Sequence, residues 1–250
     1  NFLNQFLLAV VALLATAVAL PAAAQVGLPV VNMVDDGSGG TKYSLTLQLL
    51  ALMTVLTLLP SLLLMMTSFV RIIIVFSLLR QALGTAQTPP NQVLVGLALF
   101  LTLFIMSPVL TSVYDDAIVP YFEETISFEA ALAAAEAPIR TFMLNQTRES
   151  DIGMFLEIAD NTEVTEPADV PFLTLVPAFI TSELKSAFSI GFLIYIPFVV
   201  IDLVVASVLM SMGMMMLSPM MISMPFKLLL FVLVDGWGLV TSSLVATFVI

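Results

Sequence analysis

Long uncharged runs of apolar residues alternate with short polar breaks along this chain, and the first two runs predict a helical hairpin over residues 45–113. Residues 45–70 carry no charge, and the apolar pattern continues to about residue 83. As a helix, 45–70 would be about 39 Å long, whereas the hydrocarbon core of a bilayer is roughly 30 Å thick. Residues 91–113 form the second uncharged helical run.

The break between these two runs has the residues of a tight turn. Gly84 is suited to the C-terminal end of a helix, because glycine adopts the left-handed conformation without strain. Pro89 and Pro90 cannot continue a helix, and Asn91 is a suitable N-cap for the next one. The sequence therefore predicts that the two helices are antiparallel neighbours.

A second pair of apolar runs predicts another hairpin within residues 173–250, with arms at roughly 183–217 and 225–250. Pro219 and Pro225 are expected to bracket the turn between the arms, since proline disrupts the interior of a helix.

The segment between the hairpins, 114–172, differs from both, because charged residues recur every few positions. From position 115 to position 169 there are thirteen acidic and two basic residues, which accounts for the whole formal net charge of −11. Residues 128–137 and 139–147 still have amphipathic helical patterns. We expect a small external helical subdomain, whose negative charge disfavours nucleic-acid binding.

Residues 1–24 have the pattern of a signal peptide, an apolar core followed by an A-x-A cleavage pattern. The alternative is an uncleaved anchor helix. Residues 25–44 then form an exported linker. This topology places Arg71 and Arg80 on the inner side of the membrane, as the excess of positive charge in inner loops predicts.

The composition supports an all-α, membrane-associated protein of two long helical hairpins with an external helical insert. The chain is 60% hydrophobic and 10% charged, whereas soluble domains are about 25% charged. It contains no Cys and no His, which excludes thiol nucleophiles, imidazole bases and most transition-metal sites. No cofactor is implied, and the pattern favours a protein that assembles and conducts rather than an enzyme.

Two other functions use the charges embedded in the apolar runs. A polytopic secondary transporter would use them as an ion site, although the paired broken helices of inverted repeats are not evident. An intramembrane aspartyl protease needs two Asp residues in helices, and Asp115 with Asp202 or Asp235 could be assigned that role. The residues around these positions make the protease much the weaker of the two alternatives.

The embedded charges need partners, because a charge at the bilayer centre costs several kcal/mol, about 3 or more. Arg71, Asp202, Lys227 and Asp235 all lie within apolar runs. Asp202 could relay protons or anchor a basic group such as Arg71, and we favour the structural pairing. Either the charges pair, or the helices are buried among subunits rather than in lipid.

Glu183 and Lys185 lie at the mouth of the second hairpin, and Lys227 lies near its turn. With antiparallel arms, a Glu183–Lys227 pair forms more easily between neighbouring subunits than within one. The alternative is that these are solvated charges at helix ends.

Methionine is concentrated in one part of the chain, since eight of the fifteen Met residues lie in 210–224. Methionine is unbranched and polarizable, so it adapts to irregular partners. At a constriction, stacked Met side chains would exclude ions and still yield to a passing polypeptide. The alternative is a flexible helical turn packed in a core.

The chain from about residue 45 to its C-terminus resembles the FliP family, core subunits of the flagellar type III protein export gate. The resemblance is carried by the segments 63–76, 79–85, 89–94, 104–109, 142–144, 181–185, 196–203, 213–219, 225–228 and 234–237. Residues 1–44 match poorly beyond having a signal sequence.

This resemblance implies a ring of about five copies with a central pore, joined by FliQ and FliR. FlhA and FlhB are the implied export-gate partners, and unfolded flagellar proteins are the implied substrates. The implied location is the flagellar basal body at the bacterial inner membrane, largely facing the periplasm in the assembled gate. By the same resemblance, Met214, Met215 and Met216 form a pore gasket, and Glu183 pairs with Lys227 between subunits.

Overall fold

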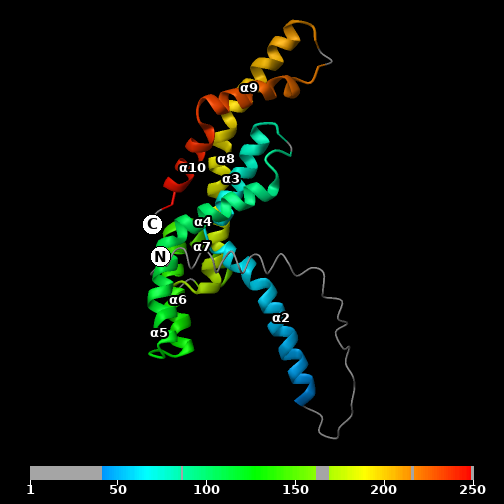
Figure 1. Ribbon diagram of the computed structural model, residues 1–250. Coiled ribbons are helices and arrows are strands. Elements are labelled where there is room, and N and C mark those ends of the chain that lie inside the picture. The colour runs from blue at the N-terminus through cyan, green and yellow to red at the C-terminus, as the bar shows by residue number, and fades with distance from the viewer. Residues whose placement is uncertain (1–40, 86, 162–168, 215–216, 249–250) are drawn as a thin grey trace. The chain divides into compact units, whose positions relative to one another are not determined.

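The computed structural model describes residues 41–85, 87–161, 169–214 and 217–248, and these form helices and turns with no strand (Figure 1). The expected signal peptide and most of the expected linker lie outside these residues. The chain divides into two units, 1–55 and 56–250. The helices are α2 (Thr41–Met65), α3 (Phe69–Ala82), α4 (Asn91–Val113), a π-helical turn (Tyr114–Ile118), α5 (Val119–Phe122), α6 (Phe128–Gln146), α7 (Glu149–Ile158), α8 (Phe172–Ser211), α9 (Pro219–Leu233) and α10 (Gly236–Ala246).

The first arm of the first hairpin is two helices rather than the continuous helix expected to residue 83. The chain bends by 70° between α2 and α3. At the break, the Thr67 hydroxyl donates to the Leu64 carbonyl at 2.7 Å and accepts from the Phe69 N–H at 3.3 Å. A threonine that satisfies backbone groups in this way competes with the helical hydrogen bonds, which explains the interruption.

The turn between α3 and α4 agrees with the sequence prediction in all but one residue. Gly84 ends α3 with a positive φ of 77°, and its N–H donates to the Gln81 carbonyl at 3.0 Å. Pro90 immediately precedes α4. The expected N-cap role of Asn91 is wrong, because Asn91 is the first helical residue and its side chain accepts a hydrogen bond from Arg80 instead.

The second hairpin is longer and its turn lies earlier than predicted. Helix α8 has 40 residues and is about 60 Å long. The expected turn between Pro219 and Pro225 is wrong, since both residues are helical. Pro219 begins α9, and proline is tolerated there because the N–H of a first helical residue has no partner within the helix. The connection between the two helices is residues 212–218. The returning arm then bends by 65° between α9 and α10, where Asp235 has a φ of 51°.

The segment between the hairpins contributes to the main core of the unit 56–250. Helix α6 runs through Pro138 as one helix, so the expected division into 128–137 and 139–147 is wrong. Its Phe142 and Met143 are buried with residues of α3, α4, α8 and α10, among them Ile72 and Phe179. Helix α3 packs closely on α8, because a Cβ at Gly191 would lie 2.2 Å from Leu78.

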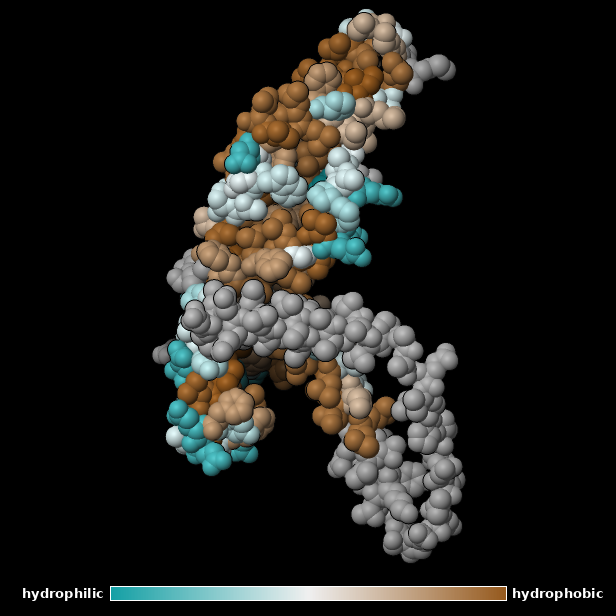
Figure 2. Space-filling view, in the orientation of Figure 1, coloured by the Kyte–Doolittle hydropathy of each residue, from teal (hydrophilic) through white to brown (hydrophobic). Residues whose placement is uncertain are grey.

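Many large apolar side chains of the described residues are exposed. In the described part of the chain, the run Asn91–Phe122 and helix α8 are each long and apolar enough to cross a membrane, and two bent helix pairs raise the number of candidate spans to four. Only 11% of an apolar 18-residue stretch of α8 is buried. Figure 2 shows apolar side chains over much of the arm formed by α8 and α9, with hydrophilic patches part-way along the molecule and at the α5–α6 end.

Candidate functional site: two buried ion pairs and a methionine-rich loop

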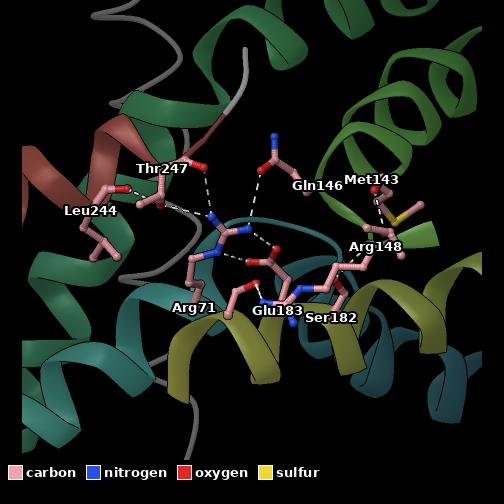
Figure 3. A network of polar contacts seen from close by, with 10 residues as sticks. Arg71, Met143, Gln146, Arg148, Ser182, Glu183, Leu244 and Thr247 are labelled. Carbon is pink, nitrogen blue, oxygen red and sulfur yellow. Dashed lines mark hydrogen bonds and ion pairs between the residues drawn. The ribbon is translucent and has the colours of Figure 1, made fainter. Parts of the chain in front are cut away.

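Helix α8 carries two acidic residues in its apolar sequence, Glu183 and Asp202, and each one meets a basic residue from another helix. Glu183 is fully buried and pairs with Arg71 of α3. The Nε atom of Arg71 donates to Oε2 of Glu183 at 2.8 Å, and its Nη2 atom donates to Oε1 (Figure 3). This is the two-bonded arrangement that suits the planar guanidinium, so the pair has a fixed geometry as well as a favourable charge interaction.

The remaining donors of Arg71 reach two other parts of the chain. Nη1 donates to the carbonyl of Thr247 at 3.2 Å and to its hydroxyl at 3.0 Å. Nη2 lies 3.4 Å from Oε1 of Gln146, at the end of α6. The guanidinium also lies over the ring of Phe248, 4.0 Å from its centroid. Arg71 therefore joins α3 and α8 to the ends of α6 and α10 (Figure 3).

The second ion pair joins α8 to α9. Lys227 is almost completely buried, and its Nζ atom donates to Oδ2 of Asp202 at 2.6 Å and to the carbonyl of Ala82 at 3.1 Å. Ala82 is the last residue of α3, where carbonyls lack helical partners and the helix dipole favours a positive charge. The ammonium group thus satisfies a helix end and a carboxylate at the same time.

Ser223 completes this second cluster from the same face of α9, one helical turn before Lys227. Its hydroxyl lies 2.5 Å from Oδ1 of Asp202, so both carboxylate oxygens have a partner. The neighbouring Met224 lies beside the turn after α3, since a Cβ added at Gly84 would lie 3.9 Å from its Cγ. The side chain of Asp202 is 31% exposed, in contrast to the buried Ser223 and Lys227.

Two more of the charged residues singled out in the sequence, Lys185 and Asp235, lie where helices contact each other or bend. Lys185 is about half exposed and pairs with the buried Asp151 of α7, which ties that helix to α8. Asp235 lies at the bend before α10 in the left-handed conformation. A Cβ at Gly238 would come 2.4 Å from its Oδ2, and a Cβ at Gly236 would come 2.2 Å from the ring of Phe231. Both glycines therefore allow the tight bend beside Trp237.

These contacts change the expected partners. The suggested pairing of Asp202 with Arg71 is wrong, because Asp202 binds Lys227 and Ser223 while Arg71 binds Glu183. A contact between Glu183 of one copy and Lys227 of the next stays a prediction, and it would require both groups to leave their present partners.

The sequence reasoning missed Ser223, Thr247, Gln146 and Asp151 as partners. Only Ser223 had a usable signal, its spacing of four residues from Lys227 on a helix. The other three approach their partners from distant parts of the chain.

The methionine-rich loop between α8 and α9 begins at a well-formed helix end. The N–H of Gly213 donates to the Met210 carbonyl and the N–H of Met214 to the Leu209 carbonyl, both at 3.0 Å, and Gly213 has a φ of 73°. This is the Schellman pattern of a glycine-terminated helix. Met214 is described and exposed, whereas Met215 and Met216 lie outside the described residues.

Exposed methionine side chains lie at both ends of this loop. A group of exposed apolar side chains is uncommon on a soluble protein and marks a surface that contacts a partner or a membrane. Met210 precedes the loop, Met212 is its first residue, and Met220 and Met221 follow it; their exposed fractions range from 57% to 78%. The arrangement gives an apolar tip at the end of a long arm.

Among the residues that the structure describes, no cluster of three or more Asp or Glu side chains could hold a metal ion. The two clusters pair acid with base at the junctions of helices, and the loop presents apolar groups. These features define a helical membrane protein whose charged residues hold its helices together.

The comparison with known proteins identifies the family. The sequence matches the FliP family over residues 52–244, and the chain belongs to that family. It is 56% identical to the flagellar biosynthetic protein FliP of Cereibacter sphaeroides, over 89% of this chain and 73% of that protein. It is 59% identical to that of Pectobacterium carotovorum, over 84% and 82% of the two chains, and 53% identical to that of Bacillus subtilis, over 85% and 96%. The family is a non-enzymatic membrane component of the flagellar export apparatus.

Proposed function

We propose that this chain is a pore-forming core subunit of the flagellar type III export gate and conducts unfolded flagellar proteins across the bacterial inner membrane. The observation that carries the proposal is the exposed, methionine-rich tip between α8 and α9 in a member of the FliP family. Flexible, polarizable side chains suit an opening that must close against ions and then fit many different polypeptide sequences.

The proposal includes assembly into a ring of about five copies with FliQ and FliR. Its support is an apolar 18-residue stretch of α8, of which only 11% is buried within the chain. A helix that is apolar on all sides requires cover by lipid or by other subunits. FlhA and FlhB would adjoin this assembly in the basal body, and the assembled helices would lie largely on the periplasmic side.

In the closed state, Met214, Met215 and Met216 from all copies would meet around the pore axis and exclude water and ions. Dewetted apolar constrictions block ions because an ion there loses its hydration shell. In each copy, the glycine-terminated end of α8 and Pro219 at the start of α9 would hold the loop in the same position.

The test is the ion permeability of membranes that contain the complete gate, made with all three of Met214, Met215 and Met216 changed to Gly. We expect a large increase in ion leak with normal ring assembly, because glycine removes the apolar side chains. The matched control changes the same three residues to Leu, which keeps apolar volume and should keep the gate tight. Equal ion leak through the Gly variant and the unaltered gate would show that these three methionines do not seal the pore.

A further inference from the structure

A group of exposed aromatic side chains lies in the acidic insert, at the turn between α5 and α6. Tyr121, Phe122 and Phe128 are 43%, 78% and 66% exposed, and Leu132, one helical turn after Phe128, is 62% exposed. The ring of Tyr121 lies edge-on to each of the other two rings, with 6.0 Å between centroids in both pairs. We call these four residues the aromatic patch. Clustered aromatic side chains that remain exposed are typical of a surface that a partner covers.

The turn that presents the aromatic patch has a well-defined backbone. Glu124 has a positive φ of 55°, and the chain reverses there at the end of α5. The N–H and the hydroxyl of Thr125 both donate to the Pro120 carbonyl, at 3.0 and 2.8 Å. The Ser127 hydroxyl accepts from a backbone N–H in the first turn of α6, which begins at Phe128. The aromatic side chains are therefore held by two capped helix ends.

The residues next to the patch along the chain are acidic. Glu123, Glu124 and Glu129 are all exposed, and residues 115–139 contain six acidic residues and no basic one. Figure 2 shows hydrophilic and apolar side chains next to each other at this α5–α6 end. Carboxylates attract Lys and Arg, and the faces of aromatic rings also attract these cations. The charge and the rings thus favour the same kind of partner.

We infer that the aromatic patch is a docking surface for a segment of another protein subunit, in which Lys or Arg residues alternate with apolar ones. The charge of the insert disfavours two other occupants. The same patch on a second copy would bring like charges together, which is unfavourable at an interface. A membrane surface that contains anionic lipids attracts basic segments and repels an acidic one.

The patch and the methionine-rich loop are suited to different tasks. Helix α6 packs on the first part of α8, where Phe142 contacts Phe179, whereas the loop follows Ser211, about 48 Å further along α8. Methionine adapts to many sequences, but Tyr and Phe offer a rigid contact surface that suits one sequence. The occupant is therefore a subunit that stays bound, not the transported chain. The inference rests on the proposed function for the presence of other subunits, and not on the methionine seal.

The test places the photo-crosslinking residue benzoylphenylalanine at position 122, in place of Phe122, in cells that assemble the complete apparatus. Mass spectrometry of the product should identify a peptide of a different protein with Lys or Arg among apolar residues, and the same substitution of Phe128 should give the same peptide. The control position is Ile158 of α7, which is 71% exposed and follows the acidic Glu157. It should give little of this product, because it lies outside the patch.

Crosslinks from Phe122 only to a second copy, only to lipid, to a segment without basic residues or to no molecule would each overturn the docking surface. Equal yields of the same peptide from positions 122 and 158 would overturn it as well. The crosslink is measured without any measurement of ion leak. A gate whose methionines do not seal would therefore contradict the proposed seal and leave this surface unaffected.

A charge reversal tests the chemistry of the occupant. Changing Glu123 and Glu129 together to Lys should lower the crosslink yield at position 122 by about ten-fold, because two attractive charges become repulsive. The matched control changes Glu149 and Glu157 of α7 to Lys, which alters the net charge equally and should leave the yield nearly the same. An unchanged yield in the first variant, or an equal loss in both, would overturn the assignment of a basic segment to this patch.

Discussion

The two buried ion pairs on α8 contain the same kinds of groups, an acid of α8 and a base from another helix, but their surroundings differ. Glu183 and Arg71 lie in the interior of the helix assembly, where the arginine also binds Thr247 and Gln146. Asp202 lies nineteen positions later, about 28 Å along the helix. Its carboxylate is partly exposed, although its partner Lys227 is buried.

This difference assigns the pairs different roles. The Glu183–Arg71 cluster joins four parts of the chain, so its loss should affect the stability of the fold as a whole. The Asp202–Lys227 cluster lies at the base of the arm and attaches α9 to two other helices. Removal of Lys227 should affect mainly the position of that arm, because water can reach the carboxylate of Asp202 that remains.

The largest expected effect comes from removing the fully buried acid. Glu183→Gln leaves the Arg71 guanidinium charged and without its carboxylate, which should lower the free energy of unfolding by about 3–5 kcal/mol. Lys227→Met, which leaves only the partly exposed carboxylate of Asp202 without its partner, should cost about 1–3 kcal/mol. Denaturant unfolding of both variants in the same detergent measures the difference. Equal losses at the two sites would contradict the distinction drawn between them.

A smaller effect is expected from Arg71→Lys, which keeps the charge and removes the planar fork. A lysine can donate to Glu183 but cannot also reach Thr247 and Gln146 with the same geometry. We expect a loss of about 1–3 kcal/mol in unfolding free energy, from two or three missing hydrogen bonds. Proteolysis near the C-terminus should rise in this variant, because Thr247 loses its attachment to α3; unaltered cleavage there would show that Arg71 does not hold the end of α10.

The smallest effect is expected at Arg80, also near the end of α3. Its guanidinium donates to the side chain of Asn91 and lies 3.4 Å from the carbonyl of Pro89, in the turn before α4. Arg80→Gln should change the unfolding free energy by about 0–1 kcal/mol, as for other exposed interactions. Lys227→Met, at the buried side of the same helix end, is the matched comparison. A larger loss of unfolding free energy for Arg80→Gln than for Lys227→Met would mean that burial of the charged group does not determine the size of the loss.

Several elements of the fold could be predicted from single residues and their spacing. Gly84 ends α3 as expected, because a left-handed residue there favours glycine. The break at Thr67 was missed, since threonine is tolerated inside many apolar helices and interrupts one only when its hydroxyl binds the local backbone. The turn before α9 was placed too late because Pro219 begins a helix as readily as it ends one.

The candidate site was predictable to a different degree. Arg71, Glu183, Asp202 and Lys227 were recognisable as groups that need partners, because a charge in an apolar helix is costly. Which acid meets which base was not recognisable, since Arg71 and Glu183 are 112 positions apart in the chain. A separation of this size along the chain does not predict how far apart two side chains lie in space, because that distance depends on how the helices pack.

By itself, the sequence determined that this is an all-helical, membrane-associated chain of the FliP family with buried charges and a methionine-rich turn. Local propensity and hydropathy are sufficient for the helices, the embedded charges and the methionine-rich turn, because these depend on neighbouring residues, whereas the family follows from the resemblance of whole segments. Only the tertiary structure decided that Arg71 pairs with Glu183, that Lys227 binds Asp202 and the end of α3, and that the insert shares the main core. Those outcomes depend on how helices pack, and the energy of a buried charge is set by the groups that packing brings within hydrogen-bonding distance.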